Sequence, residues 1–270
     1  MTAAPLLNET PGTHPAIDIC GAPPQVPGLM DFCHLNLDTV ISSGVAIFLT
    51  LAIAFLVRQR LSSAGPPGRL QLAFELAINY VRQQVHELAA EDAAFVVPLA
   101  MTIALYILIA NYLEFFPLGI FPNLVPANAD WNQTLAMALV VFFWTQGYSI
   151  KVLGLGGFLR KFTKPFDGAL WMRILFIPLN IIEEVAKPLS LSLRLFGNIF
   201  AGVVMVFLIV LLLGQCSALP VVGPIAIAPA TLAVWKGFDV LFIGAIQAFI
   251  FMLLTIVYFG QAREGLDEHH

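Results

Sequence analysis

Five long apolar stretches constrain the fold of this chain more than any other feature. They cover residues 39–57, 95–116, 134–150, 174–213 and 229–259. An α-helix needs about 17–25 residues to cross ~30 Å of hydrocarbon, because each residue adds ~1.5 Å. All five stretches are long enough, and the last two exceed the need, which predicts tilt or bending. We therefore predict an all-α polytopic membrane protein with five transmembrane helices, of which the last two are long and tilted.

Composition agrees with this class of protein. The chain is 59% hydrophobic and 11% charged, with a mean hydropathy of +0.86, whereas soluble domains are about 45–50% apolar and 25% charged. With so few charges, nucleic acid is not an expected partner. Residues 1–38 contain no Lys or Arg for the basic region of a signal peptide, so we expect the start to be retained. Cys20, Cys33 and Cys216 lack the spacing of a metal or disulfide framework, and we interpret them as incidental.

A different pattern follows the first stretch, after the break Ala-Gly-Pro-Pro-Gly at 64–68. Within residues 69–92, charged Arg82, Glu87 and Glu91 alternate with apolar side chains at helical spacing, namely Leu70, Phe74, Ala77, Ile78, Val81 and Val85. This pattern predicts an amphipathic helix that lies on the membrane surface. The third stretch follows a proline-containing loop, and Asp130 is the expected N-terminal cap of its helix.

The basic residues predict the orientation. Nine of the 13 lie in or beside the loops after the first and third spans: Arg58, Arg60, Arg69, Arg82, Lys151, Arg160, Lys161, Lys164 and Arg173. The opposite loops, 1–38, 117–133 and 214–228, contain none. Because cytoplasmic loops are enriched in Lys and Arg, we predict an outside N-terminus and a cytoplasmic C-terminus in a plasma membrane. The chain then divides into an extracytoplasmic segment, 1–38, one transmembrane ion-translocating domain, 39–262, and a cytoplasmic tail, 263–270.

Five polar residues, followed by Ala201, recur along one face of the fourth stretch at spacings of three and four residues: Glu183, Lys187, Ser190, Arg194 and Asn198. A charged side chain in hydrocarbon costs about 2.5–3.5 kcal/mol or more, so such a stripe indicates an ion path. Glu183, Glu184 and Lys187 lie near one end of the stretch, where contact with lipid headgroups or with one another is the alternative. Pro188 predicts a bend.

Arg194 lies about 20 residues from either end of its stretch, too deep for its head to reach the interface on a steep helix. Its guanidinium keeps its proton, so it can block free cation leakage and still attract a carboxylate. An ordinary ion pair within the helix bundle is the alternative.

The last stretch contributes Lys236, Asp239 and Gln247. On an unbroken α-helix Asp239 and Gln247 are separated by about 12 Å and ~80° of rotation, so they can border one water-filled cavity. A salt bridge from Asp239 to Lys236 is the alternative.

Small residues in this stretch predict a close approach of another helix: Gly237, Gly244, Ala245 and Ala248. The phenylalanines are interpreted as lipid-facing: Phe249, Phe251 and Phe259. Asn111 and Glu114 have an ionic or a plain interfacial role. No nucleotide loop, metal cluster or nucleophile triad is evident, so no cofactor or bound metal is expected.

Three segments resemble one family. Residues 187–202 read KPLSLSLRLFGNIFAG, residues 247–259 read QAFIFMLLTIVYF, and residues 130–139 read DWNQTLAMAL. Together they closely resemble the a subunit of the membrane sector of bacterial F-type ATP synthases, over roughly residues 40–262.

The resemblance implies an ion-translocating stator subunit that is not itself an enzyme. Two offset half-channels would load and unload carboxylates on a ring of c subunits, with b-type peripheral stalk subunits and the rest of the ATP synthase as further partners. Arg194 matches the family's essential arginine, Gln247 the glutamine facing it, and Glu183 or Glu184 an acidic position. Many members carry an ionisable residue nine positions after the arginine, where this chain has Val203. Asp239 is the candidate for that role.

Protons are the expected ion and sodium ions the alternative. A pore or transport subunit of another ion channel or secondary transporter is the rival function, but such proteins show selectivity motifs or repeated broken helices, and neither is evident. A purely structural membrane protein, the other rival, has no need of Arg194.

Overall fold

The computed structural model describes residues 16–18, 34–61, 68–89, 93–113, 128, 130–161, 170–214 and 228–263. Two short strands, seven α-helices and one π-helix occur in them: β1 (Ala16–Asp18), β2 (His34–Asn36), α1 (Leu37–Gln59), α2 (Arg69–Ala89), α3 (Val96–Leu113), α4 (Trp131–Lys161), α5 (Leu170–Gly214), α6 (Ala228–Gly237), the π-helix η4 (Phe238–Ile243) and α7 (Gly244–Gln261). The strands pair antiparallel, with Ile17 opposite Leu35. The sequence predicted no element there, and the three-part division of the chain stays a prediction.

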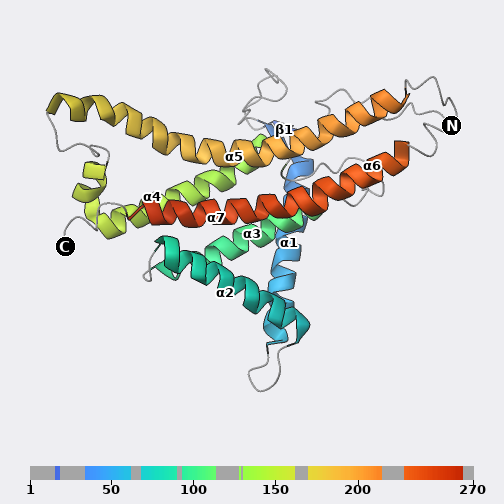
Figure 1. Ribbon diagram of the computed structural model, residues 1–270, viewed down its shortest axis with the longest axis horizontal. Coiled ribbons are helices and arrows are strands. Elements are labelled where there is room, and N and C mark those ends of the chain that lie inside the picture. The colour runs from blue at the N-terminus through green and yellow to red at the C-terminus, as the bar shows by residue number, and fades with distance from the viewer. Residues whose placement is uncertain are drawn as a thin grey trace.

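The five predicted spans are confirmed. In the described part of the chain, five helical runs are long and apolar enough to cross a membrane: α1, α3, α4, α5 and the continuous run from α6 through η4 to α7. Helix α5 has 45 residues, or ~68 Å at ~1.5 Å per residue, about twice the hydrocarbon thickness. Figure 1 shows α5 as a long, bowed ribbon above the run that ends in α7.

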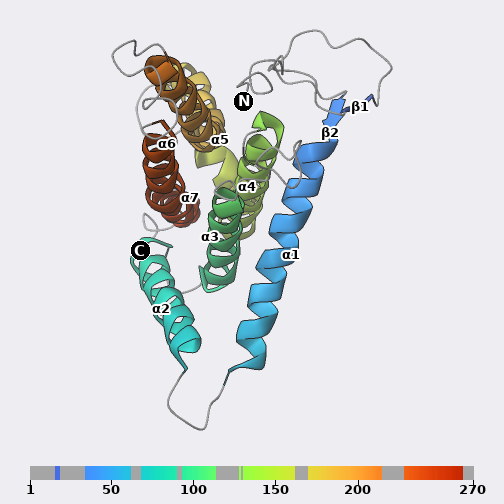
Figure 2. The same ribbon diagram turned by 90° about the vertical axis from the view of Figure 1, so that its right-hand side faces the viewer.

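Helix α2 has the predicted amphipathic character. Val81 and Val85 are buried, whereas Arg82 is exposed. The buried side packs on α3 and α7, and Figure 2 shows α2 apart from α1, with α3 between them. The described helix ends at Ala89, three residues before the predicted end.

Helix α4 begins as predicted but is longer. The backbone N–H of Asn132 donates to Asp130 Oδ1 at 2.9 Å, so Asp130 caps the helix. Predicted to end near Ile150, the helix continues to Lys161 with a kink at Gly154, where φ is 71°. A positive φ of this size suits glycine because it has no Cβ. The prediction followed hydrophobicity, which declines before the helix ends.

The core lies where α3 packs along α7 and α4 packs along α5. A cluster of buried side chains joins these four helices, including Ile107, Val141, Leu195 and Phe251. The interpretation of Phe251 and Phe259 as lipid-facing is wrong, because both are 0% exposed; only Phe249, at 42%, is exposed. In a membrane, lipid-facing and packing surfaces are equally apolar, so hydrophobicity does not separate them.

Candidate functional site

The polar stripe of α5 lies on an open face of the chain. Glu183, Ser190 and Arg194 are exposed, and Asn198 is half-buried. Leu191 and Leu195, which flank the stripe on one side, are buried against neighbouring helices. Glu183, Ser190 and Arg194 therefore face away from the bundle, whereas Lys187 packs toward α4 and α7; the exposed side chain next to Arg194, Leu193, is large and apolar.

Arg194 makes no ion pair with any residue that the structure describes. The ordinary bundle ion pair is therefore not seen in this part of the chain. Tyr258 of α7 lies within electrostatic range of the guanidinium. A permanent cation thus stands on an apolar face that is open to a partner outside the chain.

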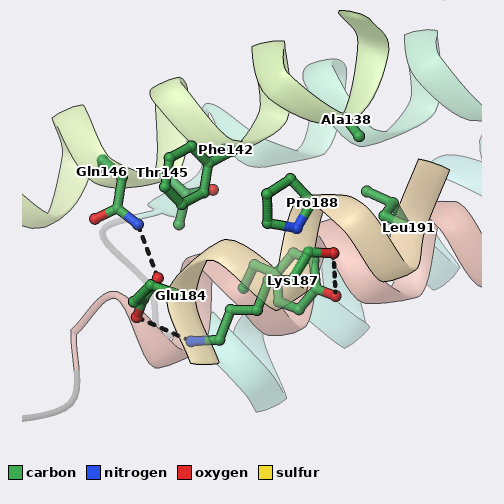
Figure 3. Close-up of a pocket in the computed structure, with 9 residues that line it drawn as sticks. Ala138, Phe142, Thr145, Gln146, Glu184, Lys187, Pro188 and Leu191 are labelled. Atoms are coloured by element: carbon green, nitrogen blue, oxygen red, sulfur yellow. Dashed lines mark hydrogen bonds and ion pairs between the residues drawn. The ribbon is translucent and has the colours of Figure 1, made fainter. Parts of the chain in front are cut away.

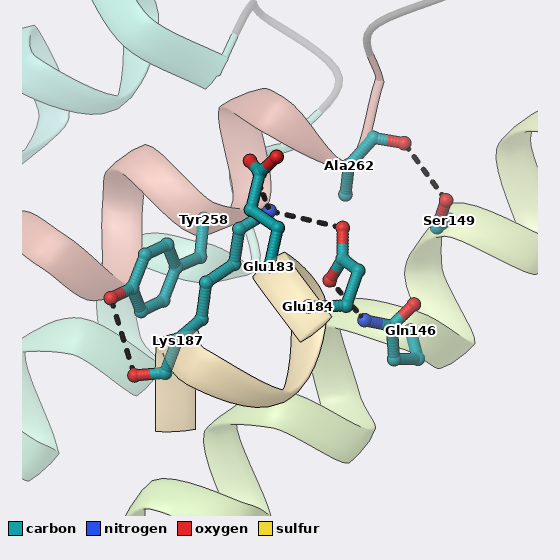
Figure 4. Close-up of polar contacts among 7 residues, drawn as sticks. All are labelled: Gln146, Ser149, Glu183, Glu184, Lys187, Tyr258 and Ala262. Carbon is teal, nitrogen blue, oxygen red and sulfur yellow. Dashed lines mark hydrogen bonds and ion pairs between the residues drawn. The ribbon is translucent and has the colours of Figure 1, made fainter. Parts of the chain in front are cut away.

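An inner cluster of polar groups, Gln146, Glu183, Glu184 and Lys187, lies toward the start of α5. Lys187 Nζ is 3.0 Å from Glu184 Oε1 and 4.0 Å from Glu183 Oε1. Gln146 Nε2, from α4, donates to Glu184 Oε2 at 2.8 Å. The Tyr258 hydroxyl, from α7, donates to the Lys187 carbonyl at 3.5 Å, as Figure 4 shows. The carboxylate of Glu184 is thus held by Lys187 of its own helix and Gln146 of α4, while Tyr258 of α7 holds the backbone of Lys187.

A small cavity borders this inner cluster. Its volume is about 10 Å³, close to the space one water molecule needs. Figure 3 shows Gln146, Glu184 and Lys187 at one end of it and Leu191 and Ala138 at the other. The Glu184–Lys187 pair therefore lies at the edge of a space that suits a single water.

Asp239 lies in the π-helix η4 and is only 6% exposed. Its carboxylate lies so close to Gly202 of α5 that a Cβ there would overlap it. Val203, which the sequence pointed to as the neighbouring position, is 54% exposed. The position of α5 that meets Asp239 is therefore Gly202, one residue earlier.

The π-helix also corrects the predicted relation of Asp239 to Gln247. The Gly244 backbone N–H donates to the Asp239 carbonyl, a five-residue step that widens the helix locally. The ~80° rotation expected from an unbroken α-helix therefore does not apply. Gln247 is 5% exposed, and its Nε2 donates no hydrogen bond to any described group.

Amide groups follow on the same side of the bundle. Asn111 Nδ2 donates to the Gly244 carbonyl at 3.2 Å, and Asn128 Nδ2 donates to Asn111 Oδ1 at 2.9 Å. A Cβ at Gly244 would lie 3.2 Å from that of Asn111, so the predicted close approach occurs there. A Cβ at Gly237, in contrast, would meet no atom of another described segment within 4 Å. Asn111 is a buried bridge between α3 and α7, and Glu114 lies outside the described residues.

Sequence reasoning missed Gln146, Tyr258 and Asn128. Gln146 is the one residue of these three with a usable signal, since a lone amide inside an apolar span needs a partner. Tyr258 and Asn128 sit near the expected ends of spans, where polar atoms are ordinary. Their contacts with Lys187 and Asn111 arise from helix packing alone.

The comparisons with known proteins agree with the motifs. The sequence profile of the ATP synthase A chain family matches residues 40–260. The chain belongs to the ATP synthase A chain family. It is 44% identical over 244 residues to ATP synthase subunit a of Mycobacterium tuberculosis, covering 87% of this chain and 90% of that relative. The subunit a of Acidothermus cellulolyticus is 38% identical over 238 residues, covering 86% and 80%.

Membership and structure together establish a multi-pass membrane subunit of this family. The polar stripe, the inner cluster and Asp239 all fall within the matched residues, 40–260.

Proposed function

We propose that this chain is the ion-translocating stator subunit of a rotary F-type ATP synthase and makes no covalent bond itself. The observation that carries the proposal is Arg194, a cation exposed on an apolar face without an ion-pair partner in the described chain. Hydrocarbon penalises such a charge by about 2.5–3.5 kcal/mol or more. A carboxylate on another membrane subunit offsets that penalty, and a ring of c subunits supplies one carboxylate after another.

Charge physics then gives direction to rotation. A ring carboxylate is neutral while it faces lipid, because an ionised one is costly there. Beside Arg194 it ionises and releases its ion toward one side of the membrane; reloading from the other side restores the neutral form. The membrane potential contributes about 2.3 kcal/mol per charge per 100 mV to this cycle.

The two polar regions of the chain suit the two routes. The inner cluster, with its water-sized cavity, lies toward the cytoplasmic end in the predicted orientation and suits ion release. Asp239 lies beside Gly202, two turns past Arg194 along α5 and toward the outer side in the predicted orientation, and suits ion entry; Gln247, Asn198 and Ser190 are the polar groups between the regions. Glu184 Oε1 and Lys187 Nζ are 3.0 Å apart. The proposed release route therefore contains a carboxylate that can accept a proton and a cation held in a fixed position.

Protons are the proposed ion, and the plasma membrane is the proposed location. The c ring is the rotating partner, and b-type stalk subunits hold the chain against it. ATP chemistry then belongs to other subunits of the synthase. Among the residues described, no group of His, Cys, Asp and Glu side chains could hold a metal ion, and the proposal uses none.

A photo-crosslinking amino acid at Leu193 tests the proposed rotor face. Leu193 is 48% exposed next to Arg194, so benzoylphenylalanine there should form an adduct with a c subunit when the purified complex is irradiated. The mass of the adduct identifies the partner. The matched control is Phe143 of α4, which is 66% exposed on another helix and should give no c-subunit adduct. Adducts of equal yield at both positions, or none with c at Leu193, contradict the proposal.

The orientation has its own test in a variant whose three cysteines are replaced by serine. Gln59 is exposed at the C-terminal end of α1, and Ala230 is exposed near the N-terminal end of α6. Because basic residues mark the cytoplasmic side, Gln59→Cys should react with a membrane-impermeant maleimide only in inverted vesicles, and Ala230→Cys only in intact cells. The reverse labelling pattern overturns the orientation and exchanges the two ion routes.

A further inference from the structure

A second, larger cavity lies between α1, α2 and α3, away from the polar stripe of α5. Its volume is about 720 Å³, within the ~300–1,000 Å³ typical of ligand pockets. Leu51 and Val57 of α1 and Val97 and Leu105 of α3 form apolar walls, and Ile78 of α2 lies between them. Figure 2 shows α2 and α1 diverging on either side of α3. We call this cavity the α1–α3 groove.

The lining of the groove is short along each of α1 and α3, which cross each other in Figure 1. Its lining runs from Thr50 to Val57 on α1 and from Val97 to Leu105 on α3, or ~10–12 Å at ~1.5 Å per residue. Half of a ~30 Å hydrocarbon layer is ~15 Å. A transmembrane helix of a partner needs walls that run through the whole thickness of the hydrocarbon layer, whereas the acyl chain of a lipid fits between walls of this length.

Both basic side chains of the groove lining belong to α2. Arg82 and His86 of α2 line the groove, one helical turn apart, and both are exposed. Arg82 makes no ion pair with a residue in the described segments. The groove lining contains no carboxylate; Glu75, two turns before Arg82 on the same face of α2, accepts a hydrogen bond from Gln71, and Glu87 accepts one from Gln83. Helix α2 thus contributes the basic groups of the lining, while the walls of α1 and α3 are apolar.

We propose that the α1–α3 groove is a binding site for an anionic phospholipid. An acyl chain lies between the walls of α1 and α3, and the phosphate lies against Arg82 and His86. The groove combines the two chemistries of such a molecule in the right order, apolar below and cationic at the surface helix. The site is separate from the proposed ion path, so its occupancy does not depend on transport.

The test uses the whole purified complex in nanodiscs of phosphatidylcholine with a small fraction of phosphatidylglycerol that carries a photoreactive acyl chain. Irradiation should place adducts on residues 50–57 and 97–105, and excess unlabelled phosphatidylglycerol, but not phosphatidylcholine, should displace them. Arg82→Gln should lower the adduct yield per assembled complex roughly fivefold, the effect expected of one basic residue at the membrane surface.

Three variants separate binding from misfolding. Arg82→Lys keeps the charge and should keep most of the adduct. Arg69→Gln, at the exposed start of α2 outside the groove lining, should leave the yield unchanged. Ala54→Trp fills the groove without altering charge and should also lower the yield. Equal labelling by a photoreactive phosphatidylcholine, or no loss in Arg82→Gln, overturns the proposal; so does benzoylphenylalanine at Thr102 capturing another subunit in place of lipid.

Discussion

Replacing Arg194 by lysine is expected to reduce ATP-driven ion uptake by about two orders of magnitude, although the charge is preserved. A loss of this size corresponds to removal of a charge-assisted interaction worth about 3 kcal/mol from the limiting step. An ammonium is compact and strongly hydrated, whereas guanidinium is planar, weakly hydrated and keeps its proton. Arg194 stands on an apolar face. The ammonium group of a lysine there must lose its water before it meets a rotor carboxylate, and the free-energy cost of that dehydration weakens the interaction.

Inverted vesicles provide the measurement, as ATP-driven acidification or sodium uptake normalised to assembled complex. Arg69→Lys is the matched control, because it makes the same chemical change at an exposed residue of α2 outside the polar stripe, and it should behave as the wild type. Retained uptake in Arg194→Lys would remove Arg194 from the ion path and with it the proposed function.

A second large loss, of about 10²-fold in ion-driven ATP synthesis, is expected for Asp239→Asn. The amide keeps the size of the side chain but cannot titrate, so it cannot pass a proton onward. Losing a positioned proton-transfer group costs about 10²–10⁴-fold in rate. Asp239 is buried, and Val203 does not replace it because its apolar side chain cannot titrate and is 54% exposed. Glu87→Gln, the same change at an exposed carboxylate of α2, is the control and should leave synthesis intact.

The close contact with Gly202 sharpens this test. Asp239→Ala removes the carboxylate and leaves room beside Gly202, so adding Gly202→Asp returns a carboxylate to the same place from the neighbouring helix. That double variant should recover part of the lost synthesis, whereas Asp239→Ala with Val203→Asp should not. If Asp239 serves only to pair with Lys236, Asp239→Asn will change the amount of assembled subunit and leave synthesis per complex normal, contrary to our expectation.

The elements of this fold were predictable because lipid imposes local rules. A helix must be apolar over the hydrocarbon thickness, so residues 39–57 predicted α1 within about two residues at each end. Asp130 was recognisable as a helix cap from its place before an apolar run. Val81 and Val85 were recognisable from their helical spacing as part of the apolar face of α2. Arg194 was equally evident, since a charge in the middle of an apolar run calls for a function.

The arrangement of the helices was not predictable in this way. Phe249 and Phe251 are two residues apart and equally apolar, yet one is exposed and the other is fully buried. The hydrophobic periodicity of the sequence did not predict the π-helix. The π-helix changes the rotation of Asp239 relative to Gln247, and Asp239 lies against Gly202 and not against Val203. Likewise, the bond from Gln146 to Glu184 joins residues 38 positions apart.

The sequence by itself determined the membrane class, the number of spans and the residues able to carry charge through the bilayer, because each depends on the free energy of placing one segment in hydrocarbon. Only the tertiary structure decided which polar groups meet and which face of α5 stays open. Lipid and protein interiors are similarly apolar, so helix faces are selected by close packing and interhelical hydrogen bonds between distant residues. Those contacts exist only once the helices have come together.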